Sequence, residues 1–176
     1  DSIDGGTFDN CANLKTVMFE DGTTEIAEGL FAGCTGIEQI TIPDTVTVIE
    51  SGAFGGCINL KEIVVPDNVT EIQSSAFEYC SSLKTVKLSE NLERIGVYAF
   101  RDCDVLKSIK IPDSVLDIDG KAFAECKELS DVVLSKNLKT MGWQVFGNDN
   151  KLTEIEIPKS LEECRYYRNN DSIDGG

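Results

Sequence analysis

The stretch IPDTVTVIESGAFGGCINL, residues 42–60, is the unit that the rest of the chain repeats. Its phenylalanine recurs every 23 residues, without insertion or deletion, at Phe8, Phe31, Phe54, Phe77, Phe100, Phe123 and Phe146. A constant period of this length is typical of a solenoid, in which units stack because none of them buries its own apolar face alone. The period therefore predicts a single elongated repeat array.

Other positions keep the same step, and each such set of equivalent positions is called a column below. Three residues after Phe the column holds Cys11, Cys34, Cys57, Cys80, Cys103 and Cys126, with Asp149 as its one departure. Six residues after Phe it holds Leu14, Ile37, Leu60, Leu83, Leu106, Leu129 and Leu152. Two more apolar columns hold Val46, Val69, Leu92, Val115, Leu138 and Leu161, and Ile26, Ile49, Ile72, Ile95, Ile118 and Met141. These columns predict a continuous core along the array.

Two further apolar columns, nine and eleven residues after Phe, alternate with a variable position. This period of two predicts a half-buried strand in each unit. The inward pairs are Val17/Phe19, Ile40/Ile42, Ile63/Val65, Val86/Leu88, Ile109/Ile111, Val132/Leu134 and Ile155/Ile157. Proline follows four of them, at Pro43, Pro66, Pro112 and Pro158, where a strand has to stop.

The unit resembles the 23-residue leucine-rich repeat of the BspA-like (Treponema pallidum type) family, whose pattern is roughly I-P-x-x-V-x-x-I-x-x-x-A-F-x-x-C-x-x-L-x-x-I-x. The likeness extends from residue 3 to about residue 161. It implies a right-handed leucine-rich-repeat solenoid of about seven units, with a parallel β-sheet on one face and little or no α-helix. It also implies a bacterial or protist protein, secreted or at the cell surface, that is used for attachment or ligand binding. That functional implication is looser than the structural one, because the fold hosts many partners.

Residues 1–161 are expected to form the repeat array, and residues 162–176 a C-terminal cap or a junction. The period requires Phe at position 169, where the chain has Asn169, and Tyr166 and Tyr167 are candidates for a lid over the last unit or for a sticky surface patch. Residues 171–176 repeat DSIDGG of the first six positions letter for letter. Either a second array begins there or the duplication is engineered.

The chain carries 31 acidic and 16 basic residues, a net charge of −15. This balance disfavours nucleic acid as a partner, because binding nucleic acid depends on neutralising phosphates with Lys and Arg. An anionic membrane surface is disfavoured for the same reason. No apolar run approaches the ~20 residues that span a bilayer, so we expect no membrane insertion. The charge either keeps a surface-rich rod soluble or attracts a basic partner.

The seven cysteines are expected to be reduced thiols and not a disulfide framework, since six of them lie in one inward column. Buried thiols act as small hydrophobic groups. Cys164 belongs to the isoleucine column and is expected to fill core space at the end of the rod. A zinc site requires several ligands converging on a point, and this chain has no histidine, so no metal and no cofactor is expected.

The absence of histidine also removes Ser-His-Asp triads and Cys-His pairs. Two-carboxylate glycoside hydrolysis remains as a remote alternative. Glu62, Asp131, Glu154 and Glu156 fall on one expected surface, but no pair among them is marked as acid and base. We therefore expect no enzyme activity.

The variable positions between the inward strand columns are expected to point outward along one exposed sheet face. This candidate ligand-binding face, called the recognition face below, comprises Thr16, Met18, Gln39, Thr41, Glu62, Val64, Thr85, Lys87, Ser108, Lys110, Asp131, Val133, Glu154 and Glu156. Variation on a fixed scaffold suits an adjustable binding surface, although unconstrained exposed positions vary in the same way. The face has a basic centre at Lys87 and Lys110 and carries no aromatic stripe for stacking sugars or bases.

An acidic column follows the proline column at Asp21, Asp44, Asp67, Glu90 and Asp113, and ends in Lys136 and Lys159. Stacked carboxylates are potential calcium ligands. Pro-Asp followed by Asn, Ser or Thr is also turn chemistry, so each Asp is expected to cap its own turn.

Together these features predict a non-catalytic recognition or adhesion module, extracellular or at the cell surface, that binds a protein or glycan ligand such as a host extracellular-matrix protein. A structural spacer or stalk domain of a larger surface protein, with no ligand of its own, is the alternative.

Overall fold

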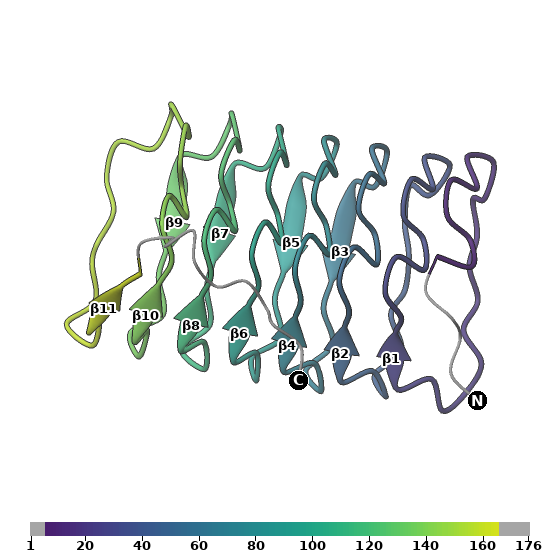
Figure 1. Cartoon of the computed structure of the whole chain (residues 1–176), viewed down its shortest axis with the longest axis horizontal. Coiled ribbons are helices and arrows are strands. Elements are labelled where there is room, and N and C mark those ends of the chain that lie inside the picture. Colours follow the sequence, from purple (N-terminus) through teal and green to yellow (C-terminus); the bar gives the residue numbers. More distant parts are fainter. Residues whose placement is uncertain (1–5, 166–176) are drawn as a thin grey trace, which may run out of the picture.

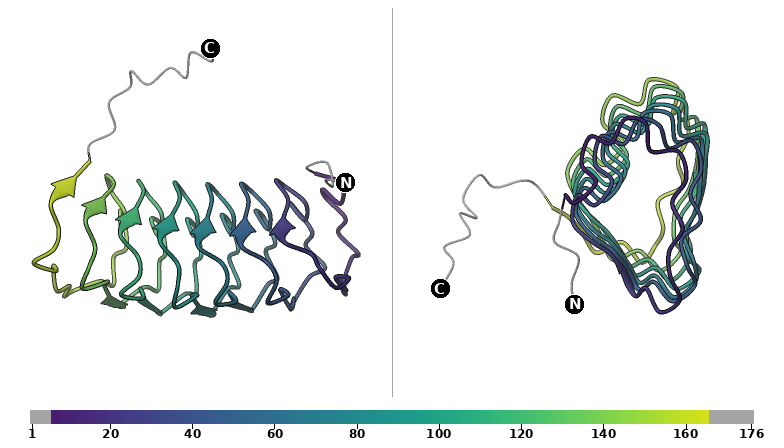
Figure 2. Two further views of the ribbon diagram at one scale, coloured as in Figure 1. Left: turned by 90° about the horizontal axis from the view of Figure 1, so that it is seen from below. Right: turned by 90° about the vertical axis from the view of Figure 1, so that its right-hand side faces the viewer.

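The computed structural model describes residues 6–165. The chain winds into a solenoid whose turns lie side by side along one axis (Figure 1) and superpose when viewed down that axis (Figure 2). One turn is 23 residues long, because paired strands join residues 23 positions apart, such as Ile26 with Ile49 and Ile63 with Val86. All strand pairs are parallel, and no helix occurs among the described residues. The expected solenoid architecture is confirmed.

The strands expected from the alternating columns form in the central units as two parallel pairs. They are β3 (Glu62–Val64) with β5 (Thr85–Lys87), and β7 (Ser108–Lys110) with β9 (Asp131–Val133). In each strand the middle residue points inward and its two neighbours are exposed. The equivalent segments of the outer units, such as residues 16–19 and 154–157, contain no assigned strand.

A second, longer ladder lies on another side of each turn, and the sequence patterns did not single it out as a sheet. Its seven short strands are β1 (Glu25–Ile26), β2 (Val48–Ile49), β4 (Glu71–Ile72), β6 (Arg94–Ile95), β8 (Asp117–Ile118), β10 (Thr140–Met141) and β11 (Glu163–Cys164). The strands β1, β2, β4, β6 and β8 each contribute one buried residue through the isoleucine column, whereas Met141 in β10 is partly buried and Cys164 in β11 is exposed. A strand of two residues has no alternation from which to recognise it.

The phenylalanine column forms the centre of the core. Neighbouring rings stack with centroids 5.1–5.8 Å apart and planes within 17° of parallel. The five internal rings, from Phe31 to Phe123, are fully buried, whereas Phe8 in the first unit is 41% exposed. Offset stacking of this kind stabilises aromatic pairs by ~0.5–1.5 kcal/mol beyond the burial of their area.

The cysteine column packs beside the rings as reduced thiols. Each buried Sγ donates to the carbonyl of the Phe in the preceding unit, from 3.0 Å for Cys34 to 3.5 Å for Cys103. Burial raises the pKa of the Cys57 thiol to about 12. Two expectations were wrong, because Cys11 and Cys164 are exposed. Both residues lie in the first and last described turns, where the column has a described neighbour on one side only.

Two positions in every turn take positive φ. The first column, two residues before Phe, comprises Gly6, Gly29, Gly52, Ser75, Tyr98, Lys121 and Gln144, with φ between 49° and 74°. The second, one residue before Cys, comprises Asn10, Gly33, Gly56, Tyr79, Asp102, Glu125 and Asn148, with φ between 57° and 72°. Several units have a residue with a Cβ atom at these positions, although only glycine adopts positive φ without strain.

Candidate functional site

The recognition face is exposed along its whole length, since all fourteen of its residues are solvent-exposed. Eight of them lie on the four three-residue strands, and the other six lie on equivalent segments of the flanking units. The inward neighbours Ile63, Val86, Ile109 and Val132 anchor these strands to the core. The outward direction of the fourteen side chains therefore follows from the burial of the residues between them.

The centre of the face is a strip of four side chains in one column, Val64, Lys87, Lys110 and Val133. The two valines are 56% and 52% exposed. Among residues 6–165, neither lysine has a carboxylate within 4.0 Å. The strip therefore presents two cations without an ion-pair partner in this range between two apolar groups, with Val64 and Lys87 on one strand pair and Lys110 and Val133 on the next.

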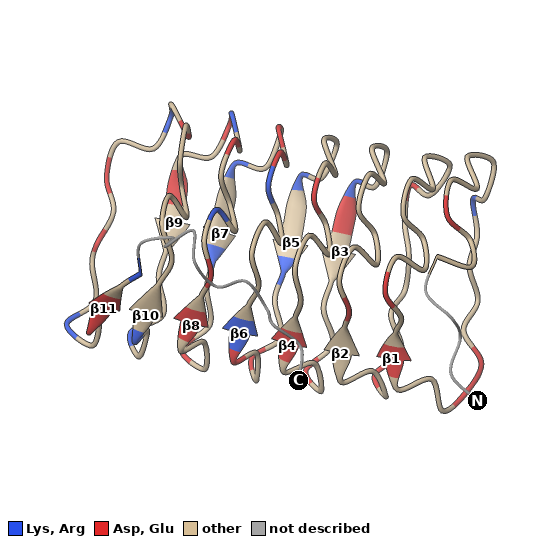
Figure 3. Cartoon of the chain, in the orientation of Figure 1, with Lys and Arg blue, Asp and Glu red and all other residues tan. Residues whose placement is uncertain are grey.

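Acidic residues lie on the two flanking strands, at the end opposite to the strip. Glu62 and Asp131 are the first residues of β3 and β9, whereas Lys87 and Lys110 are the last residues of β5 and β7. Figure 3 shows acidic segments in β3 and β9 and basic ends in β5 and β7. Many cations elsewhere on the molecule are paired, as in Arg94 with Asp119 at 2.6 Å and Lys127 with Asp104 at 3.0 Å. The recognition face thus has a basic centre on a strongly acidic protein.

The carboxylates considered for glycoside hydrolysis do not form a buried pair. Glu62, Asp131, Glu154 and Glu156 are all exposed on the open face. Glu62 and Asp131 are three units apart, on the order of 14 Å along the rod, which exceeds the ~5–9.5 Å between catalytic carboxylates. Acid catalysis at neutral pH depends on burial to hold one carboxyl protonated, and these side chains lack that burial.

The acidic column after the proline caps turns, but in a different way from the one expected. The carboxylate of Asp67 accepts the backbone N–H of Glu90 at 3.1 Å, and that of Asp113 accepts the N–H of Lys136 at 2.9 Å. Each of these residues therefore caps the turn of the following unit and not its own. No cluster of three or more potential metal ligands occurs within residues 6–165.

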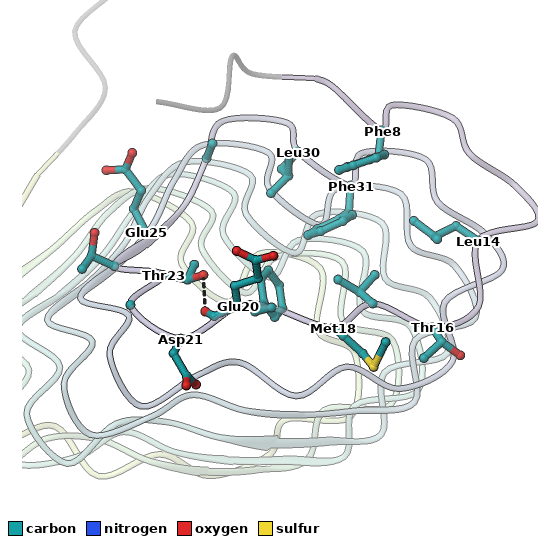
Figure 4. A pocket seen from close by; sticks show the side chains of 15 residues that line it. Phe8, Leu14, Thr16, Met18, Glu20, Asp21, Thr23, Glu25, Leu30 and Phe31 are labelled. Atoms are coloured by element: carbon teal, nitrogen blue, oxygen red, sulfur yellow. Dashed lines mark hydrogen bonds between the residues drawn. The ribbon is translucent and has the colours of Figure 1, made fainter. Parts of the chain in front are cut away.

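A cavity of about 640 Å³, which the sequence patterns did not predict, opens at the first described turn (Figure 4). Its apolar wall includes Phe8, Leu14, Val17, Phe19 and Phe31. These residues belong to inward columns, and the first unit has no described neighbour on its outer side. The column pattern could therefore have predicted that the core is open at this turn. The polar rim of the cavity carries Glu20, Asp21 and Thr23.

A second unusual site is Asp149, which is the one departure in the cysteine column. Its side chain is only 8% exposed, and desolvation by this burial raises its pKa to about 7. The residue lies in the last described turn, five residues before Glu154 of the recognition face.

The comparison with protein families identifies this architecture. The model of the BspA type leucine-rich repeat region matches residues 1–104 and 48–173, with six copies of the repeat. The chain belongs to this family. Solved structures that this BspA-type chain resembles include a leucine-rich repeat protein from Bacteroides ovatus ATCC 8483, with 36% identity and a TM-score of 0.77. A comparison with curated proteins finds no match.

Two further solved structures have folds similar to that of this BspA-type chain. The leucine-rich repeat protein of T. pallidum is 31% identical, with a TM-score of 0.78, over 84% of this chain and 69% of that protein. A leucine-rich cell surface protein of Faecalibacterium prausnitzii A2-165 is 29% identical, with a TM-score of 0.55, over 90% of this chain and 52% of that protein. The match to the Bacteroides ovatus protein covers 86% of this chain but 40% of the relative's length.

The described part of this BspA-type chain contains no helix that could cross a membrane.

Proposed function

We propose that this chain is a non-catalytic recognition or adhesion module of a cell-surface or secreted protein. Its ligand is a protein or a glycan, and it binds on the recognition face. The observation that carries the proposal is the strip Val64–Lys87–Lys110–Val133, in which two cations that have no ion-pair partner among residues 6–165 lie between two exposed valines. The family and its cell-surface relative support an extracellular location.

The chemistry of the strip favours a ligand that carries negative charge next to apolar groups. An acidic segment of an extracellular-matrix protein has both features, and an acidic glycan has the first. Ion pairs formed at a partly desolvated interface contribute to both specificity and association rate. A neutral sugar is less suited, because no residue of the recognition face is aromatic.

The test is saturable binding of the purified chain, in physiological salt, to a panel of extracellular-matrix proteins, mucins and glycans. The variant Lys87→Glu/Lys110→Glu is expected to weaken binding at least about tenfold, since each reversed charge repels the ligand that it previously attracted. The matched control is Lys136→Glu/Lys139→Glu, which makes the same change in net charge outside the recognition face. Both variants should unfold close to the wild-type temperature, because all four lysines are exposed.

Equal loss of binding in the two variants would indicate that net charge, and not the recognition face, governs the interaction. If the wild-type chain shows no saturable binding to any member of the panel, the proposal is contradicted. The spacer function would then be the better account.

A further inference from the structure

Aromatic and cationic side chains gather in the loops around the phenylalanine column, outside the strands of the recognition face. The guanidinium carbon of Arg101 lies 5.8 Å from the ring centre of Tyr79 and 5.3 Å from that of Tyr98, which is within the reach of a cation–π contact. Tyr79 is 49% exposed, and Tyr98 and Arg101 are partly exposed. These residues belong to middle units of the rod that have described neighbours on both sides, so their exposure does not result from an end of the chain.

A second contact of this kind continues the cluster in the next units. Lys121 occupies the position of Tyr98 one period further along, and its Nζ lies 4.4 Å from the ring centre of Trp143. The Trp143 ring lies against Gly120, where an added Cβ atom would be 2.6 Å from a ring carbon. The carbonyl of Gly120 accepts the backbone N–H of Tyr98 at 3.2 Å. The two contacts are therefore adjacent, and their side chains are called the aromatic cluster below: Tyr79, Tyr98, Arg101, Lys121 and Trp143.

The two tyrosines occupy backbone positions that favour glycine. Tyr79 has φ of 61° and Tyr98 has φ of 59°, and their counterparts in earlier units are Gly56 and Gly52. A residue with a Cβ atom is strained at positive φ, and a ring that stays partly exposed gains less from burial in return. Strained residues of this kind cluster at functional sites, ligand-binding sites among them. The conformation of the tyrosines therefore favours a role in binding over a role in folding.

The charge of Arg101 is compensated within the chain. Its Nη1 lies 3.3 Å from Glu78 Oε1, and its Nε lies 3.2 Å from Asp102 Oδ2. An anion at this site would meet the two carboxylates as well as the guanidinium, so it would gain little net attraction. Lys87 and Lys110 on the recognition face differ, because they have no ion-pair partner among residues 6–165. The aromatic cluster therefore favours an uncharged ligand.

A neutral sugar has the chemistry that matches the cluster. Its C–H groups carry slight positive charge and pack on the negative faces of aromatic rings, while its hydroxyl groups need polar partners. A guanidinium has more N–H donors, and a carboxylate more acceptor sites, than these ion pairs use, so Arg101, Glu78 and Asp102 can form further hydrogen bonds. Trp143 lies two units beyond Tyr98, about 10 Å along the rod at the spacing of stacked strands. A ligand that contacts both of these rings is therefore an oligosaccharide and not a single sugar.

We propose that the aromatic cluster is a binding site for neutral oligosaccharides, separate from the recognition face. Sugar rings pack on Tyr79 and Tyr98, and sugar hydroxyl groups form hydrogen bonds with Arg101 and its two carboxylate partners. Lys121 and Trp143 extend the site along the rod. The chain then has two surfaces of different specificity, one for an anionic ligand and one for an uncharged glycan.

The test is isothermal titration calorimetry of the full chain with short neutral oligosaccharides of glucose, mannose, galactose or N-acetylglucosamine. At least one of them is expected to bind saturably. Tyr79→Gly/Tyr98→Gly removes both rings and is expected to weaken this binding at least about tenfold, because the stacking contacts are lost. The variant should fold, since Gly56 and Gly52 hold the equivalent positions in earlier units. The matched control Ser75→Gly introduces glycine in the column of Tyr98 without removing a ring, and should bind like the wild type.

Two further variants separate this site from the fold and from the recognition face. Tyr79→Gly alone removes the more exposed ring and should weaken binding about two- to fivefold. It should unfold close to the wild-type temperature, because the relief of strain offsets the lost contacts. Lys87→Glu/Lys110→Glu changes only the recognition face, so it should bind neutral oligosaccharides as tightly as the wild type.

The proposal is overturned if no neutral oligosaccharide binds saturably, or if Tyr79→Gly/Tyr98→Gly binds as tightly as the wild type. Loss of sugar binding in Lys87→Glu/Lys110→Glu would overturn it too. A protein ligand is the other use of exposed aromatic rings, which are common in the centres of protein interfaces. An extracellular-matrix protein that binds the wild type but not the double tyrosine variant, together with no binding of neutral sugars, would assign the cluster to a protein partner instead.

Discussion

Asp149 Oδ1 accepts a hydrogen bond from the backbone N–H of Cys126 at 2.9 Å, at a position where the preceding units have a cysteine. In those units the thiol donates to a phenylalanine carbonyl of the unit before, as Cys126 does to Phe100 at 3.3 Å. An ionised carboxylate has no proton to donate, and Asp149 Oδ2 is buried with no hydrogen-bond partner among the described residues. Desolvation by burial raises the Asp149 pKa to about 7, against the opposing effect of the Cys126 N–H.

The raised pKa predicts that the C-terminal units lose stability as the pH rises. The unfolded chain ionises Asp149 near its ordinary pKa, whereas the folded chain keeps the proton until about pH 7. Stability is therefore greatest below the unfolded pKa and declines as the pH rises to about 7, by on the order of 4 kcal/mol in total. Denaturant unfolding at pH 5 and pH 8 measures the larger part of this decline.

Asp149→Asn is the matching variant, because its amide keeps an acceptor for the Cys126 N–H and adds a donor in place of the buried Oδ2. It should unfold at higher denaturant concentration than the wild type at pH 8 and show a smaller dependence on pH. A pH dependence that is unchanged in this variant would assign the effect to other carboxylates.

Much of the fold could be predicted from the sequence because a solenoid repeats its local environment. The period of Phe54 gave the length of one turn, and the alternation around Ile63 gave the strands β3, β5, β7 and β9. The longer ladder could not be recognised in the same way, because Glu71–Ile72 and its equivalents are too short to alternate. The ends differ for another reason: burial there depends on whether a neighbouring unit is present and not on the residue type. Cys11 is exposed and Cys57 is buried although both occupy one column.

The candidate site, like the fold, could be predicted from the sequence only in part. The outward direction of Lys87 and Lys110 follows from the burial of their neighbours in sequence, so it could be predicted. The lack of an ion-pair partner for either lysine among the described residues is a three-dimensional property, since their potential partners lie on adjacent units. The identity of the ligand depends on the chemistry of another molecule, which this sequence does not encode.

Thiol reactivity provides a second prediction. Ellman's reagent should label Cys11 and Cys164 rapidly in the native chain, because these are the two exposed cysteines. The other five should react only after unfolding, because burial raises their pKa and excludes the reagent. A Cys11→Ser/Cys164→Ser variant should show no rapid phase. A rapid phase that persists in this variant would indicate that the core opens more readily than the packing implies.

Truncation of the phenylalanine column should cost stability according to position. Phe77→Ala is expected to lower the free energy of unfolding by about 3–5 kcal/mol, since the ring is fully buried and its loss leaves a cavity between two stacked neighbours. Phe8→Ala removes a ring that is 41% exposed and stacks on one side only, so its cost should be well under half of that. Urea unfolding of both variants tests the difference, and equal costs would contradict the stacked arrangement.

The positive-φ column before Phe predicts a stabilising substitution. Ser75 has φ of 57°, in the same column as Gly52 with φ of 64°. A residue with a Cβ is strained in this region, whereas glycine is not, so Ser75→Gly should raise the free energy of unfolding by about 0.5–1 kcal/mol. The neighbouring Ser74 is not among the residues with positive φ, and Ser74→Gly should lower stability, because glycine there only adds freedom to the unfolded chain. The sign of the two changes is the decisive observation. If both substitutions destabilise, the strain at Ser75 is smaller than the entropy that glycine adds to the unfolded chain.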